Sequence, residues 1–387
     1  MSRLLLLLAA VAQAREIAFP PVAAIHGAAG GRQVPLHHQT YQSSGSIDVD
    51  DVDLTVDAMG GLTSFAHLPY VSCFSPQTDA EVGSYDIAVL GAPFDTATSF
   101  RPGARFGPHG IRDGSRRIRP AHSWSVYTGL NRFEEWAKLV DCGDAPLTFT
   151  DNTVALKQLV KATKLISARK PNNESMTAAP RILMLGGDHT ITLAALRSTY
   201  AHWGVVSVIH FDSHIDTWNP HLENGGVTEY AAVNHGTFLH IAHEEGLISN
   251  DSSIHAGIRA PLGTRRDDLD NDVQCGFEIV TARDIDRIGT QGIIDQLKKR
   301  VGGNNVYITV DIDVLDPAFA PATGTSEPGG WTSRELLTIL DGLVGLKVIG
   351  GDVVEVAPAY DNTGETTCLA AAEVARSLIS LMVATPV

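Results

Sequence analysis

The 387-residue sequence has few cysteines and few basic residues, and the apolar run at its N-terminus is short. Lys and Arg number 29 against 44 Asp and Glu, and the resulting net charge of −15 argues against nucleic acid or an anionic membrane surface as a partner. The negative net charge mildly favours cationic small molecules as ligands or substrates. The cysteines are far apart and form no C-x-x-C motif, so neither a zinc knuckle nor a disulfide framework is indicated; they are Cys73, Cys142, Cys275 and Cys368.

The N-terminal apolar run, Leu4–Ala12, is too short to span a bilayer. It follows Arg3 and ends at Ala12-Gln13-Ala14, an order typical of a signal peptide and its cleavage site. We therefore expect residues 1–14 to be a signal peptide, with secretion and no membrane association after its removal; a cytoplasmic protein is the alternative. The N-glycosylation sequons at Asn173 and Asn250 suit secretion, although sequons also arise by chance.

The remaining sequence has ordinary globular composition, with 44% apolar and 19% charged residues. Residues 15–60 show little periodicity and are expected to form an N-terminal extension, and residues 61–387 are expected to form one domain. Helical patterns lie between most of eight short apolar runs, which predicts a single-domain, three-layer α/β/α fold with an eight-stranded parallel sheet. The runs are Asp86–Leu90, Ala137–Asp141, Arg181–Leu185, Val205–Ile209, Ser253–Gly257, Phe277–Val280, Val306–Val310 and Lys347–Val354.

Polar side chains follow four of these runs at their carboxyl ends, where parallel α/β sheets bind ligands. Each stretch alone would suit a solvated strand end or a cap, but four at one end of a sheet favour a site. The stretches are Gly186-Gly187-Asp188-His189, His210-Phe211-Asp212-Ser213-His214-Ile215-Asp216, Asp311-Ile312-Asp313 and Asp352-Val353-Val354-Glu355.

Alternation along an extended strand places Asp212, His214 and Asp216 on one face. Carboxylates and imidazoles that converge there would repel and desolvate one another without a cation. The set exceeds the needs of one ion but suits two divalent ions that share bridging carboxylates. Because it is rich in oxygen, with one imidazole per ion, it suits Mn²⁺ better than Zn²⁺. The six candidate ligands are His189, Asp212, His214, Asp216, Asp311 and Asp313.

Three of these stretches resemble the signatures of the arginase/agmatinase (ureohydrolase) family. They are Gly186–Thr192, Asp212–Asp216 and Asp311–Pro317, and the resemblance extends from about Gly61 to the C-terminus. The segments Ser99–Pro108 and Glu327–Gly330 are similar to the agmatinase branch and unlike true arginases. The family implies an arginase-like fold, two Mn²⁺ per chain, a guanidino substrate and a homo-oligomer.

The resemblance also implies residue roles. His189 and Asp216 would bind one manganese ion, His214 and Asp313 the other, and Asp212 and Asp311 would bridge both. Asp216 would also orient the attacking hydroxide. Glu355 would bind the guanidinium, and His235 would carry protons to the leaving amine as urea is released. Otherwise, Glu355 would pair with a surface arginine and His235 would be a loop histidine held by backbone.

Other polar residues have plainer interpretations. His210 is expected to support the site from inside without binding metal. His240 and His243 are expected on a helix face, and Arg265-Arg266-Asp267-Asp268 on a solvated one.

Substrate choice depends on the segment Trp218–Val233, which is longer here than in bacterial agmatinases. It offers Glu223 and Glu229 but no Lys or Arg, which favours agmatine. The alternative is 4-guanidinobutyrate, whose carboxylate could meet backbone N–H groups of Asn224-Gly225-Gly226. Two further alternatives are a single-metal deacetylase-like enzyme and a metal-binding protein without catalysis.

Overall fold

The computed structural model describes residues 61–74, 83–221 and 228–387. The predictions for the signal peptide at 1–14 and the extension at 15–60 lie outside the described residues. The same is true of Glu223 and Asn224-Gly225-Gly226.

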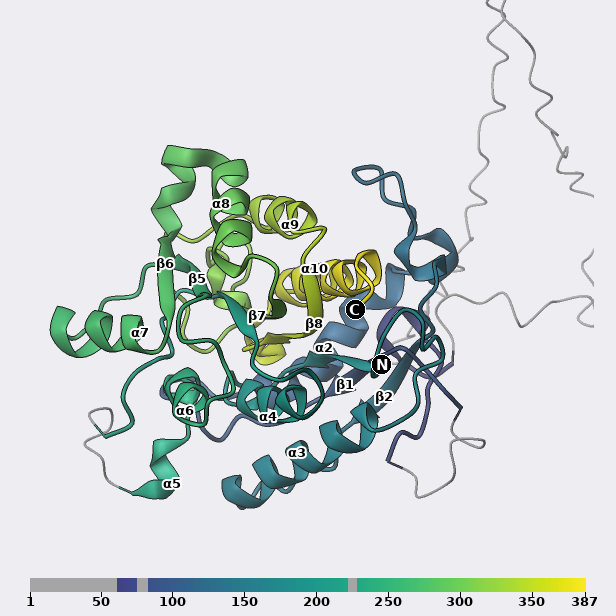
Figure 1. Ribbon diagram of the computed structural model, residues 1–387, viewed down its shortest axis with the longest axis horizontal. Helices are drawn as coiled ribbons and strands as arrows, with labels where there is room; N and C mark the ends of the chain where they lie inside the picture. The colour runs from purple at the N-terminus through teal and green to yellow at the C-terminus, as the bar shows by residue number, and fades with distance from the viewer. Residues whose placement is uncertain (1–60, 75–82, 222–227) are drawn as a thin grey trace, which may run out of the picture. The chain divides into compact units, whose positions relative to one another are not determined.

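An eight-stranded sheet, parallel at every pairing, forms the centre of the described unit (Figure 1). Its order is β2-β1-β3-β8-β7-β4-β5-β6, so the chain fills one half, crosses to the other, and closes the middle with its last two strands. All eight predicted runs are strands, with ends that differ by a few residues. The strands are β1 (Ile87–Gly91), β2 (Leu139–Asp144), β3 (Arg181–Leu185), β4 (Ser207–Phe211), β5 (Ser253–Ile258), β6 (Phe277–Thr281), β7 (Asn305–Asp311) and β8 (Lys347–Val354).

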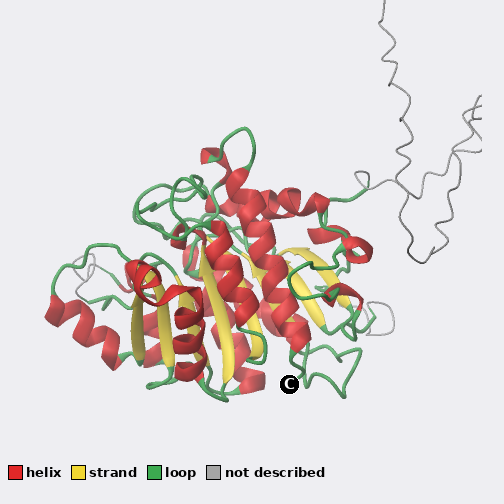
Figure 2. Cartoon of the chain, turned by 90° about the horizontal axis from the view of Figure 1, so that it is seen from above, coloured by secondary structure: helices red, strands yellow, loops and turns green. Residues whose placement is uncertain are grey.

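Helices cover both faces of the sheet, which confirms the predicted α/β layers (Figure 2). One face packs against α3 (Asn152–Ser167), α4 (Ile191–Trp203) and α6 (Phe238–Glu244). The other packs against α2 (Gly107–Gly114), α8 (Ile285–Val301), α9 (Ser333–Gly342) and α10 (Thr366–Ala384). Two short helices, α5 (Glu229–Ala232) and α7 (Asp270–Gln274), complete the set.

Burial on both faces explains why the strands are continuously apolar. In β1, Ile87 and Val89 enter one hydrophobic cluster, whereas Ala88 and Leu90 enter a second cluster on the opposite face. No position of such a strand meets water, so no polar alternation develops.

Helix ends follow local capping chemistry. A capping box begins α9, where the Thr332 hydroxyl accepts from the Glu335 N–H and the Glu335 carboxylate accepts from the Thr332 N–H. Among the described helices, α10 alone is apolar and long enough to cross a bilayer. Two-thirds of its most apolar window is buried, and it packs on β8, α2 and α9 as a core helix.

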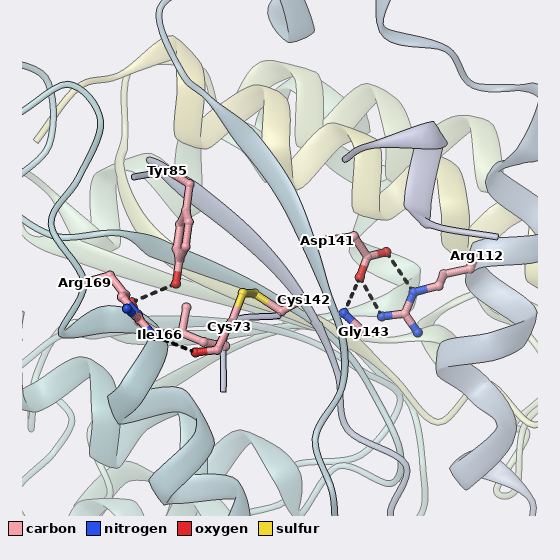
Figure 3. Close-up of a disulfide and its surroundings, with 8 residues drawn as sticks. All are labelled: Cys73, Tyr85, Arg112, Asp141, Cys142, Gly143, Ile166 and Arg169. Atoms are coloured by element: carbon pink, nitrogen blue, oxygen red, sulfur yellow. Dashed lines mark hydrogen bonds and ion pairs between the residues drawn. A yellow bond between two sulfur atoms is a disulfide. The ribbon is translucent and has the colours of Figure 1, made fainter. Parts of the chain in front are cut away.

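A disulfide joins Cys73 to Cys142, which corrects the expectation drawn from cysteine spacing (Figure 3). The two cysteines are 69 residues apart in sequence, so no local motif marks them. They meet because the chain at Tyr70 bridges β2 beside Asp141, and the Val71 N–H donates to the Asp141 carbonyl. The crosslink therefore fixes the start of the described chain to the edge strand of the sheet. Cys275 and Cys368 are free and buried.

Candidate metal centre and substrate pocket

The predicted site residues follow β3, β8, β7 and β4, which are neighbours in the middle of the sheet. Four carboxyl ends therefore meet at one edge, as the sequence predicts. This edge includes the place where strand order reverses, and such a crevice is the usual ligand site of parallel α/β sheets.

A two-glycine turn after β3 brings His189 into the site. A Cβ atom on Gly187 would lie 2.0 Å from the Phe94 carbonyl oxygen, so only glycine allows this close approach. The Gly187 carbonyl accepts from the Glu355 N–H at 2.8 Å, and the His189 N–H donates to Glu355 Oε1 at 2.8 Å. The turn therefore fixes His189 and Glu355 relative to each other.

The ring of His189 is fully buried and has two different environments. Its Nε2 lies 2.7 Å from the Thr309 hydroxyl, which in turn donates to Asp352. Since that hydroxyl gives its proton to Asp352, Nε2 carries the ring proton and Nδ1 keeps a lone pair. Nδ1 has no hydrogen-bond partner and faces the Asp212, Asp216 and Asp311 carboxylates at 3.0, 3.1 and 3.4 Å.

A second cluster lies on the other side of Asp212. Nδ1 of His214 is 3.2 Å from Asp212 Oδ1 and 3.1 Å from Asp313 Oδ2. Asp313 is held by Ser213, whose N–H and hydroxyl both donate to its Oδ1. Asp212 is thus shared between the two clusters, as a bridging ligand would be. Asp311 lies outside both compact groups, although its Oδ1 accepts the Asp313 N–H at 2.8 Å.

The sequence predicted that these side chains converge, but the reason given, alternation along an extended strand, is wrong for His214 and Asp216. β4 ends at Phe211, so His214 and Asp216 lie in the following loop and do not alternate along a strand. Asp216 reaches the site from a left-handed backbone conformation with φ of 53°. Glu355 does so too, with φ of 61°. Positive φ values are strained in non-glycine residues and occur mostly where the surrounding structure fixes a functional side chain.

The electrostatics of the buried clusters favour cations. Burial raises the pKa of Asp216, and the charge of Asp212 raises it further, to about 6. Burial and the neighbouring Asp313 and Asp212 charges raise the pKa of Asp311 well above its usual range. Four ionised carboxylates carry a charge of −4, which two divalent ions would balance. The unpaired, buried Nδ1 of His189 aims at the same place, so the residues fit a two-metal centre.

His235 and Glu355 lie beside these clusters. Nδ1 of His235 is 3.0 Å from Glu355 Oε1, and its Nε2 accepts from the Ser99 N–H at 2.9 Å. Its tautomer therefore carries the proton on Nδ1. Burial lowers the pKa of His235, but the hydrogen bond to Glu355 and the charges of Glu355, Asp216 and Asp188 together outweigh burial and raise the pKa to about 9.

A pocket of about 260 Å³ opens beside His235. Segments 96–99, 230–231 and 233–236 line it, together with Asn152 and Trp218. None of these lining residues is Lys, Arg, Asp or Glu, so hydroxyl and amide groups supply its polarity. Part of the predicted substrate segment, including Tyr230, thus borders the pocket.

The polar residues for which no metal-binding or catalytic role was predicted lie mostly where expected. His240 and His243 lie on α6, and the His240 ring is buried between Cys275 and Glu244. In the run Arg265–Asp268, Asp268 is buried and accepts from the Thr264 N–H, so the expected solvated face is only partly correct.

Sequence reasoning missed the residues that support the ligands. Thr309 lies in none of the predicted stretches, whereas Asp352 and Ser99 lie in stretches that gave them no role, and only the contacts show what the three side chains do. Asp352 was noted at a strand end without a role. The pairing of β7 with β8 places Asp352 directly beside Thr309, and this neighbour indicates its role as the acceptor for the Thr309 hydroxyl.

Comparisons with known proteins agree with this geometry. The model of the arginase family matches residues 85–380. The chain is 49% identical over 362 residues to the Schizosaccharomyces pombe protein named "Putative agmatinase 1", which covers 92% of this chain and 89% of that one. It is 38% identical to the proclavaminate amidinohydrolase of Streptomyces clavuligerus, over 80% and 90% of the two chains. The solved structure of a proclavaminate amidinohydrolase from S. clavuligerus superimposes with a TM-score of 0.72, 36% identity, and coverage of 84% and 99%.

Proposed function

Because this chain belongs to the arginase family and is a hydrolase of C–N bonds in linear amidines, we propose that it is a manganese agmatinase. The reaction converts agmatine and water to putrescine and urea, a step of polyamine metabolism. One observation carries the proposal: His189 turns an unpaired Nδ1 toward three buried carboxylates, beside a second His–Asp cluster that shares Asp212.

The candidate ligands divide into two sets, one for each ion. His189 and Asp216 would hold one ion, His214 and Asp313 the other, and Asp212 would lie between them with Asp311 as the second bridge. Oxygen ligands dominate and each ion has one imidazole, which favours Mn²⁺ over Zn²⁺. When bound, two such ions lower the pKa of a water molecule toward neutrality and so supply a nucleophile.

The protein's own residues bind and orient the substrate. Oε1 of Glu355 is occupied by His189 N–H and His235, which leaves Oε2 to bind a guanidinium through charge-assisted hydrogen bonds. His235 lines the pocket, and its Nε2 contacts the backbone N–H and the hydroxyl of Ser99. In the imidazolium form, which the raised pKa of His235 favours, that nitrogen carries a proton and can pass it to the leaving amine once the Ser99 N–H has moved away.

The pocket supports an amine tail. None of its described lining residues is Lys or Arg, and the one basic side chain, His235, is already paired with Glu355, so a carboxylate tail would find no free cation among them. An ammonium group, by contrast, can donate to hydroxyl and carbonyl oxygens. The net charge of −15 also attracts the agmatine dication more than a guanidino acid, although salt screens that attraction.

Urea release measured across agmatine, 4-guanidinobutyrate, 3-guanidinopropionate and arginine tests the proposal. We expect the highest kcat/KM for agmatine. A clear preference for 4-guanidinobutyrate would refute the charge argument and favour a guanidinobutyrase. Metal analysis of the same preparation should find two manganese ions per chain; one zinc ion would indicate a deacetylase-like enzyme, and metal without turnover a non-catalytic protein.

Secretion is the second part of the proposal. The Cys73–Cys142 disulfide supports it, because such crosslinks persist in oxidising compartments. Asn250 is exposed and Asn173 is half-buried, in segments outside helices and strands. Peptide-N-glycosidase treatment of protein from the culture medium should lower its apparent mass; protein found only in the cytoplasm would contradict secretion. The homo-oligomer stays a prediction, which light scattering on the purified chain can measure.

A further inference from the structure

Arg259 directly follows β5 and contacts the loops that carry candidate ligands after β4 and β7, the next two strands along the sheet. Its backbone N–H donates to the Ser213 carbonyl at 3.0 Å, and the Ala260 N–H donates to the same oxygen at 2.9 Å. Its guanidinium donates to main-chain carbonyl oxygens at 2.6–3.3 Å, and these belong to Gly257, Asp313, Val314, Leu315 and Glu327. One residue thus joins segments that follow three neighbouring strands.

The guanidinium matches these acceptors in number and shape. Arginine carries five N–H donors in one rigid, planar group, and the described structure offers it these five carbonyl oxygens. Because each of these contacts ends on the main chain, the group holds backbone positions and occupies no carboxylate oxygen of the metal centre. Gly330 leaves room for it, since a Cβ atom there would lie 2.6 Å from Nη2 of Arg259.

Asp313, a candidate ligand, is held at both its backbone and its side chain. Nη2 of Arg259 donates to the Asp313 carbonyl at 2.6 Å, while the N–H and the hydroxyl of Ser213 donate to Asp313 Oδ1 at 3.0 and 2.7 Å. Ser213 is in turn held by the backbone N–H of Arg259. The three residues therefore form a closed ring of hydrogen bonds, and a shift of Arg259 would move both supports of the Asp313 carboxylate.

His214, the candidate ligand of the same ion, is reached through Glu327. Nε and Nη2 of Arg259 donate to the Glu327 carbonyl at 3.1 and 2.7 Å, and Oε1 of Glu327 lies 4.0 Å from Nε2 of His214. The hydrogen bonds of Arg259 within the described residues do not extend to His189 or Asp216, the candidate ligands of the other ion. The support that Arg259 gives is thus confined to one half of the metal centre.

We propose that Arg259 is a positioning residue that fixes the backbone around His214 and Asp313 and so sets the affinity of one of the two manganese sites. This inference rests on the proposed two-metal function. Groups that hold a ligand from behind keep it oriented toward the ion, and their removal typically weakens metal binding about 10–100-fold. Because the contacts of Arg259 serve one half of the centre, its loss weakens one ion and spares the other.

Arg259→Met tests this selectivity, with Arg300→Met as a matched control. Arg300 also has a half-buried guanidinium that donates to main-chain carbonyls, but these belong to Ser253, at the opposite end of β5, and to Gly276. Manganese titration of the metal-stripped full-length chain, followed by electron paramagnetic resonance, gives the affinity of each site. We expect Arg259→Met to bind one ion as wild type does and the second about 10–100-fold more weakly. Arg300→Met should bind both ions as wild type does.

The resonance spectrum separates a selective loss from a general one. At two equivalents of manganese, wild type should show the signal of a coupled pair, whereas Arg259→Met should show that of an isolated bound ion and require excess manganese to form the pair. Equal weakening of both ions, or unchanged affinity for both, would overturn the proposal. The same selective loss in Arg300→Met would also overturn it, because the effect would then follow from destabilisation alone.

Arg259→Lys keeps the test decisive if Arg259→Met unfolds in thermal melts. Lysine keeps the positive charge, but its three donors share one nitrogen and cannot serve five carbonyl oxygens on separate segments. We expect the same selective weakening of one ion, by about 10-fold or more; wild-type affinity for both ions in Arg259→Lys would overturn the proposal. A wild-type chain that binds no pair of ions would refute the proposed function and this inference with it, whereas failure of the inference alone leaves two-ion binding by wild type intact.

Discussion

Replacing Thr309 with valine should weaken metal binding without touching a ligand. The Thr309 hydroxyl is the partner of His189 Nε2 at 2.7 Å, and both residues are fully buried. Valine has the same shape but cannot accept, so the buried N–H would lose its partner, at a cost of about 1–3 kcal/mol in the free energy of unfolding. The ring could then rotate or move its proton to Nδ1, which would remove the lone pair that faces Asp212. We expect manganese affinity to fall about 10–100-fold.

Thr309→Ser is the matched control, because it keeps the hydroxyl and loses only a methyl group. Chelator dialysis followed by metal analysis should show that the Ser variant retains its ions and the Val variant does not. Urea release at saturating manganese should recover in part for Val, since the ligands remain. Val and Ser variants with identical affinity would refute the view that Thr309 sets the tautomer of His189.

Four other outcomes are expected. Asp212→Ala should abolish activity because it removes the carboxylate that both ions share. Removal of the metal ions should also abolish activity, and full turnover by the metal-free protein would exclude the two-metal mechanism. His235→Ala should lower turnover about 10²-fold or more with metal content intact, and loss of metal would show that its role is misassigned. The pKa of His235 is raised to about 9 in the metal-free protein, so its contribution to the free energy of unfolding is fully present below about pH 6.5 and is lost as the pH rises through about 9. Denaturant melts of wild type and His235→Asn should therefore converge above about pH 9. A difference that stays constant with pH would contradict this pairing of His235 with Glu355. Cys73→Ser should lower the free energy of unfolding by about 4 kcal/mol because it opens a long loop, and an unchanged melt would show that the Cys73–Cys142 bond is absent.

Most of the architecture could be predicted from local sequence. The central strands are short apolar runs because both faces of the sheet are covered: every position of β1, β4 and β5 is buried, whereas the edge strand β6 keeps Glu278 and Thr281 exposed. The α9 capping box is also local, since Thr332 and Glu335 are three residues apart. The metal-centre residues stood out because each stretch directly follows a strand, so their meeting at one sheet edge needed only the rule for parallel sheets.

The sequence by itself thus determined the strands, their direction and the stretches that meet at the site. Only the tertiary structure decided which partners stand behind the ligands, because those contacts join residues far apart in sequence. His189 and Thr309 are 120 positions apart, and His210 and His255 are 45 apart on the neighbouring strands β4 and β5. The left-handed backbone at Asp216 was equally hidden, since a strained conformation is imposed by surrounding packing and hydrogen bonds and not by the residue that adopts it.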